Sequence, residues 1–136
     1  MSDNEPVCRV LEAGAPFVGK QGFTYKPAVS AETVASRGLH MQLLTIPPGG
    51  RAKAHKHEAH ETAIYVLSGE GCMWWGERLE HHLVSPAGAF VYIPADMPHL
   101  PYNRSPSEPC VAVIARTDPN EQESVVLLPE LDAIHA

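Results

Sequence analysis

Residues 49–71, GGRAKAHKHEAHETAIYVLSGEG, join a histidine-rich half to an apolar half. In an extended backbone His55 and His57 point the same way, because side chains alternate with a period of two. Two imidazoles on one side of a strand can converge on one metal ion. Together with His60 and Glu61, which lie within four residues of His57, they favour a metal site over a solvated polar loop.

The apolar half of this stretch predicts a β-strand over 63–67 that ends in a tight Ser-Gly-Glu-Gly turn over 68–71. Apolar side chains fall on both faces of the strand, which indicates that both faces are covered. Such a strand fits a small barrel whose outside packs on another sheet or on another subunit.

The rest of the chain reads as short strands separated by turns. Thirteen prolines and ten glycines interrupt the 136 residues, and no helical periodicity persists for the 10 or so residues that a helix needs. Short helical turns are expected at 31–36 and 130–136. The other expected strands are 22–26, 39–46, 71–75, 81–84, 89–93, 110–116 and 124–128. Short strands at regular spacing indicate an all-β sandwich or barrel.

A second stretch, residues 88–103 (GAFVYIPADMPHLPYN), supplies a further histidine. The two stretches resemble the paired signature motifs of the cupin superfamily, G-x5-H-x-H-x3 or x4-E-x6-G and G-x5-P-x-G-x2-H-x3-N. The matching residues of the first motif are Gly49, His55, His57 and Gly69, and those of the second are Gly88, Pro94, His99 and Asn103.

The chain departs from these motifs at two positions. Thr62 occupies the glutamate position when counted back from Gly69, whereas Glu61 keeps the three-residue gap from His57. Asp96 stands where the second motif has its second glycine, and Asp tolerates the turn conformations of Gly, though less freely. The turn before His99 is therefore expected to survive.

The cupin resemblance implies a double-stranded β-helix, or jelly-roll barrel, in one domain over 1–136, with the motifs at 49–69 and 88–103. It implies that His55, His57 and His99 hold one divalent transition metal, and imidazole ligands suit Fe, Mn, Ni, Cu or Zn. We expect Glu61 as the fourth ligand, because a carboxylate can reach across a one-residue slip. His60 is the competing candidate.

Four further side chains are candidates for lining a substrate pocket: Trp74, Trp75, His82 and Tyr102. Alternation sends Trp74 and Trp75 to opposite faces of a strand, so one of them is expected in or near the cavity. A histidine or tyrosine beside the metal could move a proton. Ordinary core packing or surface exposure is the alternative for each, and no residue is assigned as catalytic.

Composition excludes several classes of protein. The 136 residues are 44% hydrophobic and 19% charged, which fits one globular domain. The net charge of −6 with scattered basic residues disfavours nucleic acid as a partner. No apolar run approaches the roughly 18 residues of a membrane span, and the polar start over 1–6 is unlike a secretory signal. Three spaced cysteines suggest no disulfide framework. We therefore expect a cytoplasmic protein.

The resemblance leaves the activity open, because one fold hosts many functions. We expect a metal-dependent enzyme of the oxygenase type that acts on a small molecule. The alternatives are a non-catalytic ligand-binding barrel and a metal-assisted isomerase or lyase. The resemblance to single-domain cupins also implies a homodimer, because such a barrel has an exposed sheet edge and an apolar outer face, and a segment such as 17–26 completes a neighbour's sheet.

Overall fold

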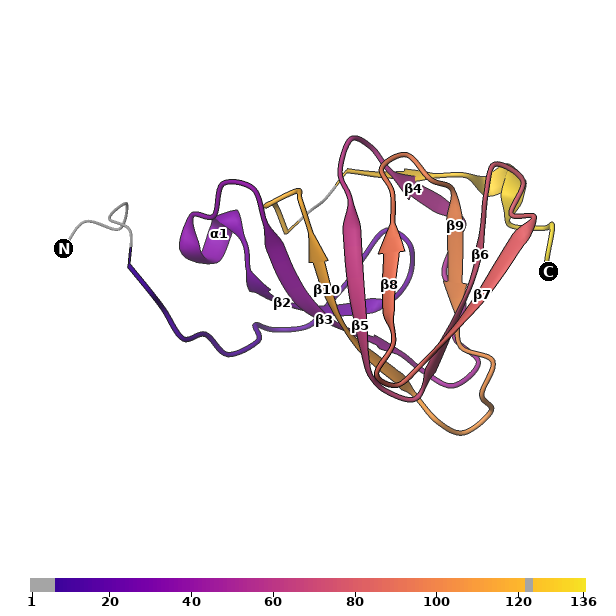
Figure 1. The fold of residues 1–136 in the computed structure, drawn as a ribbon, viewed down its shortest axis with the longest axis horizontal. Coiled ribbons are helices and arrows are strands. Elements are labelled where there is room, and N and C mark those ends of the chain that lie inside the picture. The colour runs from indigo at the N-terminus through magenta and orange to yellow at the C-terminus, as the bar shows by residue number, and fades with distance from the viewer. Residues whose placement is uncertain (1–6, 122–123) are drawn as a thin grey trace.

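The computed structural model describes residues 7–121 and 124–136, so the polar start over 1–6 lies outside it. Nearly all of its regular structure is β-strand, as expected (Figure 1). The elements are β1 (Phe17–Val18), β2 (Thr24–Val29), α1 (Ala31–Val34), β3 (His40–Ile46), β4 (His55–His57), β5 (Thr62–Ser68), β6 (Glu70–Trp75), β7 (His81–Pro86), β8 (Phe90–Ile93), β9 (His99–Tyr102), β10 (Cys110–Arg116), β11 (Val125–Leu127) and the 3-10 turn η1 (Pro129–Leu131). None of the helices among these residues is long and apolar enough to cross a membrane.

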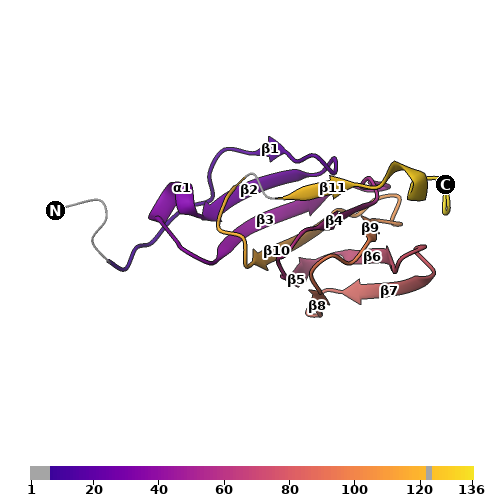
Figure 2. The same cartoon turned by 90° about the horizontal axis from the view of Figure 1, so that it is seen from above.

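The strands form two antiparallel sheets that face each other (Figures 1 and 2). One, called here sheet A, has the order β1-β2-β3-β10-β5-β8, and the other, sheet B, has the order β11-β4-β9-β6-β7. Several neighbours, among them β3 and β10, β5 and β8, and β4 and β9, come from distant parts of the sequence, which is the winding of a jelly roll. Within the described residues the two sheets are not hydrogen-bonded into one closed ring.

Alternation in the long strands of sheet A builds the core between the sheets. In β10 the buried positions are Cys110, Ala112, Ile114 and Arg116, and the residues between them are only half-buried. β3 alternates in the same way, and its inward Leu44 and Ile46 pack with Phe23 and Tyr25. Burial of one face of each strand fixes the register, because a one-residue slip would turn that face to solvent.

The expected strands all overlap observed ones, but β1, β4 and β9 were not among them. β4 has three residues with lysine between two histidines, and β9 contains a proline, so neither has the apolar alternation that predicts a strand. The turn expected at 31–36 is α1, which Ser30 caps through its hydroxyl. At the C-terminus the expected turn is the shorter η1.

A second, smaller core lies on the outer face of sheet B. Ala54, Leu79 and Leu100 are buried there against Leu131, and Trp74 packs on the same group. The C-terminal segment covers this face and runs alongside the strand that carries two of the histidines, since β11 pairs with β4. The chain end thus supports the wall of the barrel that contains those histidines.

Candidate metal centre

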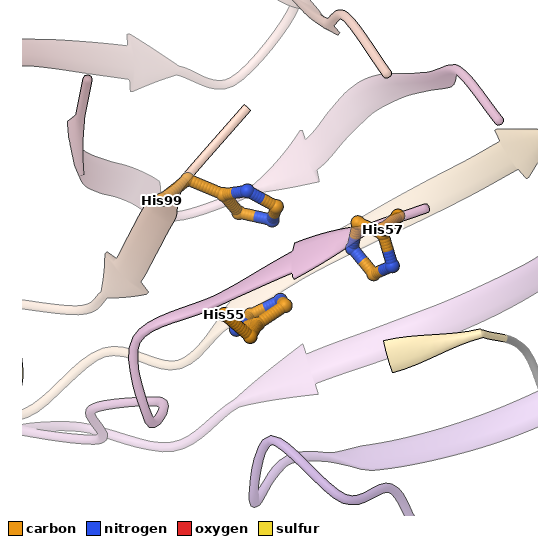
Figure 3. A group of neighbouring side chains, drawn as sticks. All are labelled: His55, His57 and His99. Carbon is orange, nitrogen blue, oxygen red and sulfur yellow. The ribbon is translucent and has the colours of Figure 1, made fainter. Parts of the chain in front are cut away.

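Three histidines meet on the inner face of sheet B. His55 and His57 lie on β4, and His99 lies directly opposite His55 on β9. Their ligand atoms all lie within 4.8 Å of one another. The side chains are 2%, 7% and 2% exposed, respectively. Figure 3 shows His55 and His57 side by side on one strand, with His99 extending toward them from the next. This is the convergence that the H-x-H spacing predicts.

Backbone carbonyls fix the tautomer of two of these rings. Nδ1 of His55 lies 2.6 Å from the Lys53 carbonyl oxygen, and Nδ1 of His99 lies 2.8 Å from the Met97 carbonyl oxygen. A carbonyl only accepts, so each Nδ1 carries the proton and donates it. The lone pair of each ring is then on Nε2, which is how metal-ligating histidines are commonly oriented. The donor set therefore fits a divalent transition metal.

Turns around the site hold the two strands in place. Asp96 has a φ of 62°, a left-handed conformation that Asp adopts more readily than most residues, and its N–H donates to the His57 carbonyl at 2.9 Å. At the far end of β9, the Asn103 side chain donates to the carbonyls of Ile46 and Glu108. The Asp in a glycine position thus keeps the turn before His99, as expected.

The histidines line a cavity of about 70 Å³ between the two sheets. Most of its walls are apolar, with Leu44, Val66 and Ile93 among them. The buried polar side chains on its walls, besides the histidines, are Gln21, Gln42, Thr62, Ser85 and Arg116. The cavity provides a small, largely apolar space beside the histidines.

A family model for the cupin domain matches residues 42–115, which contain both signature stretches and all three histidines. The chain belongs to the cupin family.

Solved structures agree on the fold. An oxalate decarboxylase of Lactobacillus farciminis, in a formate complex, is 18% identical with a TM-score of 0.69 over 84% of this chain and 33% of that one. The oxalate decarboxylase of Bacillus subtilis at pH 4.6 is 24% identical, with a TM-score of 0.69 over 84% of this chain and 29% of that one. This cupin thus spans about a third of their length. No curated protein sequence matches it.

The glutamate position of the first cupin motif holds a threonine that faces inward. Thr62 is 6% exposed and lines the cavity, whereas the exposed Glu61 accepts a hydrogen bond from the Tyr92 hydroxyl. The Glu61 N–H donates to the Thr117 hydroxyl, and the Glu61 carbonyl accepts from the Thr117 N–H. These two bonds fix the outward direction of the Glu61 side chain. The three-histidine group does not include Glu61, so its role as fourth ligand stays a prediction.

His60, the competing fourth ligand, is buried next to the group but is not part of it. Its ring centroid lies 5.0 Å from that of His57, and its Nδ1 lies 3.7 Å from a carboxylate oxygen of Asp118. Among the described residues, only His55, His57 and His99 bring three ligand atoms close enough together to share one metal ion.

The four side chains proposed for the pocket lie elsewhere. Trp74 pairs with Leu100 and His82, so all three lie on the outer face of sheet B, opposite to His99. There Trp74 stacks on His135, and Tyr102 hydrogen-bonds to His82. The His82 imidazole and the Tyr102 hydroxyl thus bond to each other on the outer face of sheet B.

Trp75 is the cross-strand neighbour of His99 and lies on the same face of sheet B. It does not line the cavity. It stacks on the exposed His81 at the end of the barrel, with ring centroids 4.3 Å apart. Alternation thus separates the two tryptophans as expected, and neither reaches the cavity.

Gln42 and Arg116 are among the cavity residues that the sequence did not single out. Each continues the inward alternation of its strand, Gln42 ahead of Leu44 and Arg116 after Ile114. That alternation is the signal that could have found them. Two arginines near the motifs instead point away: Arg51 donates to carbonyls of the C-terminal segment, and Arg104 pairs with Glu70 at the surface.

Two thiols lie in the same region and are protonated at neutral pH. Burial is the main cause that raises the pKa of Cys110, which lines the cavity. Burial likewise raises the pKa of Cys72, against the opposing effect of the Arg104 guanidinium. Among the described residues, neither thiol belongs to the group of close ligand atoms that His55, His57 and His99 form.

Proposed function

We propose that this cupin is a metal-dependent enzyme that acts on a small molecule with oxygenase-type chemistry. The observation that carries the proposal is the meeting of three histidine ligand atoms within 4.8 Å on the wall of a mostly apolar cavity. Of the sequence candidates, His55, His57 and His99 are the proposed ligands.

The residues present define what such a site can do. A redox-active divalent ion such as Fe, Mn, Ni or Cu would supply Lewis acidity and reactivity toward dioxygen, and Zn would supply Lewis acidity alone. Three neutral imidazoles leave the positive charge of the ion unreduced and its remaining coordination positions free for oxygen atoms of a substrate. Apolar walls keep water away, which strengthens the electrostatic interactions inside.

The similar structures support a small substrate, because they are named oxalate decarboxylases and oxalate is small. Chemistry without dioxygen, by a metal-assisted lyase or isomerase, is the second candidate. The same names favour it, since a decarboxylation cleaves a carbon–carbon bond.

The test begins with elemental analysis of untagged protein purified without chelator, beside His57→Ala and the matched variant His81→Ala, which alters an exposed histidine outside the group. About one equivalent of metal in the parent and His81→Ala, lost in His57→Ala, supports the site.

Oxygen uptake then tests the activity. Protein loaded with each of the five metals is offered diketones, catechols and 2-oxo acids in an oxygen electrode. Consumption that His57→Ala abolishes supports an oxygenase. Product formation without oxygen uptake supports the lyase or isomerase, and no turnover with any metal supports a non-catalytic binding barrel.

We also propose a homodimer, because the outer face of sheet A is apolar. Cross-strand register places Leu43, Val113, Tyr65 and Phe90 in one row across the sheet. Phe90 is 80% exposed in the single chain. Contiguous apolar surface of this kind marks interaction sites. Light scattering coupled to size exclusion should give twice the chain mass of 14.8 kDa, and a single-chain mass would contradict the dimer.

The cysteines support the cytoplasm as the proposed location. Cys8, Cys72 and Cys110 are all free thiols, and free thiols persist in reducing compartments. Cell fractionation tests this, and recovery of the protein outside the cytoplasmic fraction would contradict it.

A further inference from the structure

The last strand of sheet A, β8, has one open edge (Figure 2). It pairs with β5 on one side, and no other strand of the described chain pairs with its far side. Phe90 and Tyr92 on its outer face are 80% and 60% exposed, whereas Val91 and Ile93 line the cavity. An open edge presents backbone N–H and C=O groups that a further strand can bind.

The other terminal strands of the two sheets are less suited to such pairing. β1 and β11 contain only two and three residues, and β7 ends in Pro86, which has no N–H to donate. β8 has four residues without a charge or a proline, and all of them are aromatic or β-branched, as strands favour. Short length, charge and proline are features that protect a sheet edge from further strands. β8 is thus the least protected of these edges.

The register with β5 decides which backbone groups β8 presents. The Val66 N–H donates to the Ala89 carbonyl at 3.1 Å, so the carbonyl at position 89 faces β5. Hydrogen-bonded positions recur at every second residue of an antiparallel strand. The backbone groups of Val91 therefore face β5, and those of Phe90 and Tyr92 point to the open edge.

We infer that β8 binds β8 of a second copy, antiparallel, about a twofold axis that passes through Val91. This inference rests on the proposed homodimer and names its interface. Phe90 and Tyr92 of each copy both donate to and accept from the backbone of the other copy, and the two A sheets become one continuous sheet. Such a contact uses the same surface on both copies and closes at two.

The side chains select this register. Residues directly opposite each other across an antiparallel pair point to the same face, so Phe90 must oppose an outward residue. An axis at Val91 places Phe90 opposite Tyr92 of the second copy, which gives an aromatic pair on each side of the axis. An axis at Tyr92 would instead place Pro94 opposite Phe90. An axis at Phe90 would place Tyr92 opposite Gly88, where the chain turns with a φ of 90°. The aromatic match of this edge with itself assigns a second copy as the occupant.

A disulfide across the axis tests the pairing. Cys8 is an exposed thiol, so the cysteine variants are made in full-length Cys8→Ser protein. In an antiparallel pair without hydrogen bonds, such as Val91 with its copy, the Cα atoms lie about 4.5 Å apart, within the range of about 4.4–6.8 Å that a disulfide spans. With oxidised glutathione as the oxidant, Val91→Cys should run mostly as a covalent dimer on a non-reducing gel.

Val18→Cys is the matched control, because Val18 is also a valine in an edge strand of sheet A and is 71% exposed. It should run mostly as a single chain. β1 belongs to the segment 17–26, which the cupin resemblance places on a neighbour's sheet, so a covalent dimer of Val18→Cys alone would move the interface to β1 and overturn the inference. Equal cross-linking of both variants would also overturn it, as would none at Val91→Cys.

Proline separates edge pairing from packing of the outer faces. Tyr92→Pro removes an N–H that points to the open edge, and it leaves the bonds to β5 in place. Tyr92→Thr loses the same ring and the same bond to Glu61 but keeps the N–H. By symmetry Tyr92→Pro loses a backbone bond in each half of the pair, so its dimer should dissociate at a roughly 10- to 100-fold higher concentration than the Tyr92→Thr dimer. Sedimentation velocity over a dilution series measures both, and equal dissociation constants would refute the edge pairing.

The outcomes separate this inference from the proposed homodimer. A parent protein that sediments as a single chain at every concentration overturns both. A dimeric parent whose Val91→Cys variant does not cross-link, and whose two Tyr92 variants dissociate alike, overturns the edge pairing alone. Circular dichroism verifies the fold of each variant, and if one set of variants does not fold, the other set decides.

Discussion

Asp132 fastens the C-terminal segment to the strand that carries two of the histidines, and its replacement by alanine should weaken both the fold and the metal site. Its Oδ1 accepts from the Ala54 N–H at 2.7 Å, next to His55. Ala54 is fully buried, so in Asp132→Ala this N–H loses its partner away from water. An unsatisfied buried donor costs about 1–3 kcal/mol in free energy of unfolding.

The effect should reach the metal because β4 has few other supports. Only His55 of β4 pairs with β9, whereas all three residues of β4 pair with β11. The carbonyl of Asp132 also accepts from Arg51 at 2.6 Å. Loosening this segment releases one side of β4. Removal of a group bonded directly to a metal ligand typically changes metal affinity by about 10–100-fold, and Asp132 acts one bond further away, through the Ala54 backbone. We expect a loss near the lower end, since Arg51 still holds the backbone.

Two assays on each variant check this prediction. Urea unfolding of the metal-free protein gives the loss of stability, and competition with a chromophoric chelator gives the dissociation constant for Zn²⁺. Asp132→Asn keeps an acceptor oxygen in the same place, so it should recover most of both quantities. If Asp132→Ala matched the parent in stability and in Zn²⁺ affinity, the support of β4 by the C-terminal segment would be refuted.

Three further predictions concern other parts of the molecule. Glu61→Gln tests the predicted fourth ligand: a ligand role predicts weaker Zn²⁺ binding, whereas an unchanged affinity would leave the carboxylate on the Tyr92 hydroxyl outside the cavity. Thr62→Glu should raise the Zn²⁺ affinity by adding a carboxylate inside the cavity, and chelator competition measures both variants. Phe90→Asp should halve the mass seen by light scattering and change stability by less than about 0.5 kcal/mol, since the side chain is exposed; an unchanged dimer would place the interface elsewhere. Burial raises the pKa of the Cys110 thiol in the folded state. Above about pH 9 this thiol therefore ionises first in the unfolded state, and the free energy of unfolding falls as the pH rises. Cys110→Ala should reduce that fall, measured as urea midpoints between pH 7 and 10, and an equal fall in both proteins would exclude this thiol as its cause.

The sequence by itself determined the longer strands and the histidine group, but not β1, β4 and β9 as strands. Period-two alternation identifies the inward face of β3 and β10 wherever one face is apolar, and the H-x-H spacing places His55 and His57 together in any extended backbone. The spacing of the second motif adds His99. Asp96 could be predicted to keep its turn, because left-handed backbone is tolerated by Asp as a local property.

Only the tertiary structure decided which side chain enters the cavity at the start of β5. Ala59 has a φ of 62°, which reverses the chain between β4 and β5, so alternation counted from His57 does not continue into the next strand. The register of β5 against β8 and β10 turns Thr62 inward and Glu61 outward. Counting residues cannot supply that register, because it depends on partners far along the chain.

The cavity wall and the outer aromatic cluster were decided in the same way. Gln42 and Arg116 are far apart in sequence, and the pairing of β3 with β10 brings them to one wall. Alternation could say that Trp74 and Trp75 separate, but the sheet pairing decided which faces outward, and the C-terminal segment then covered Trp74. Local geometry makes the side chains of each strand alternate, and long-range pairing decides which of the two alternating sets faces the cavity.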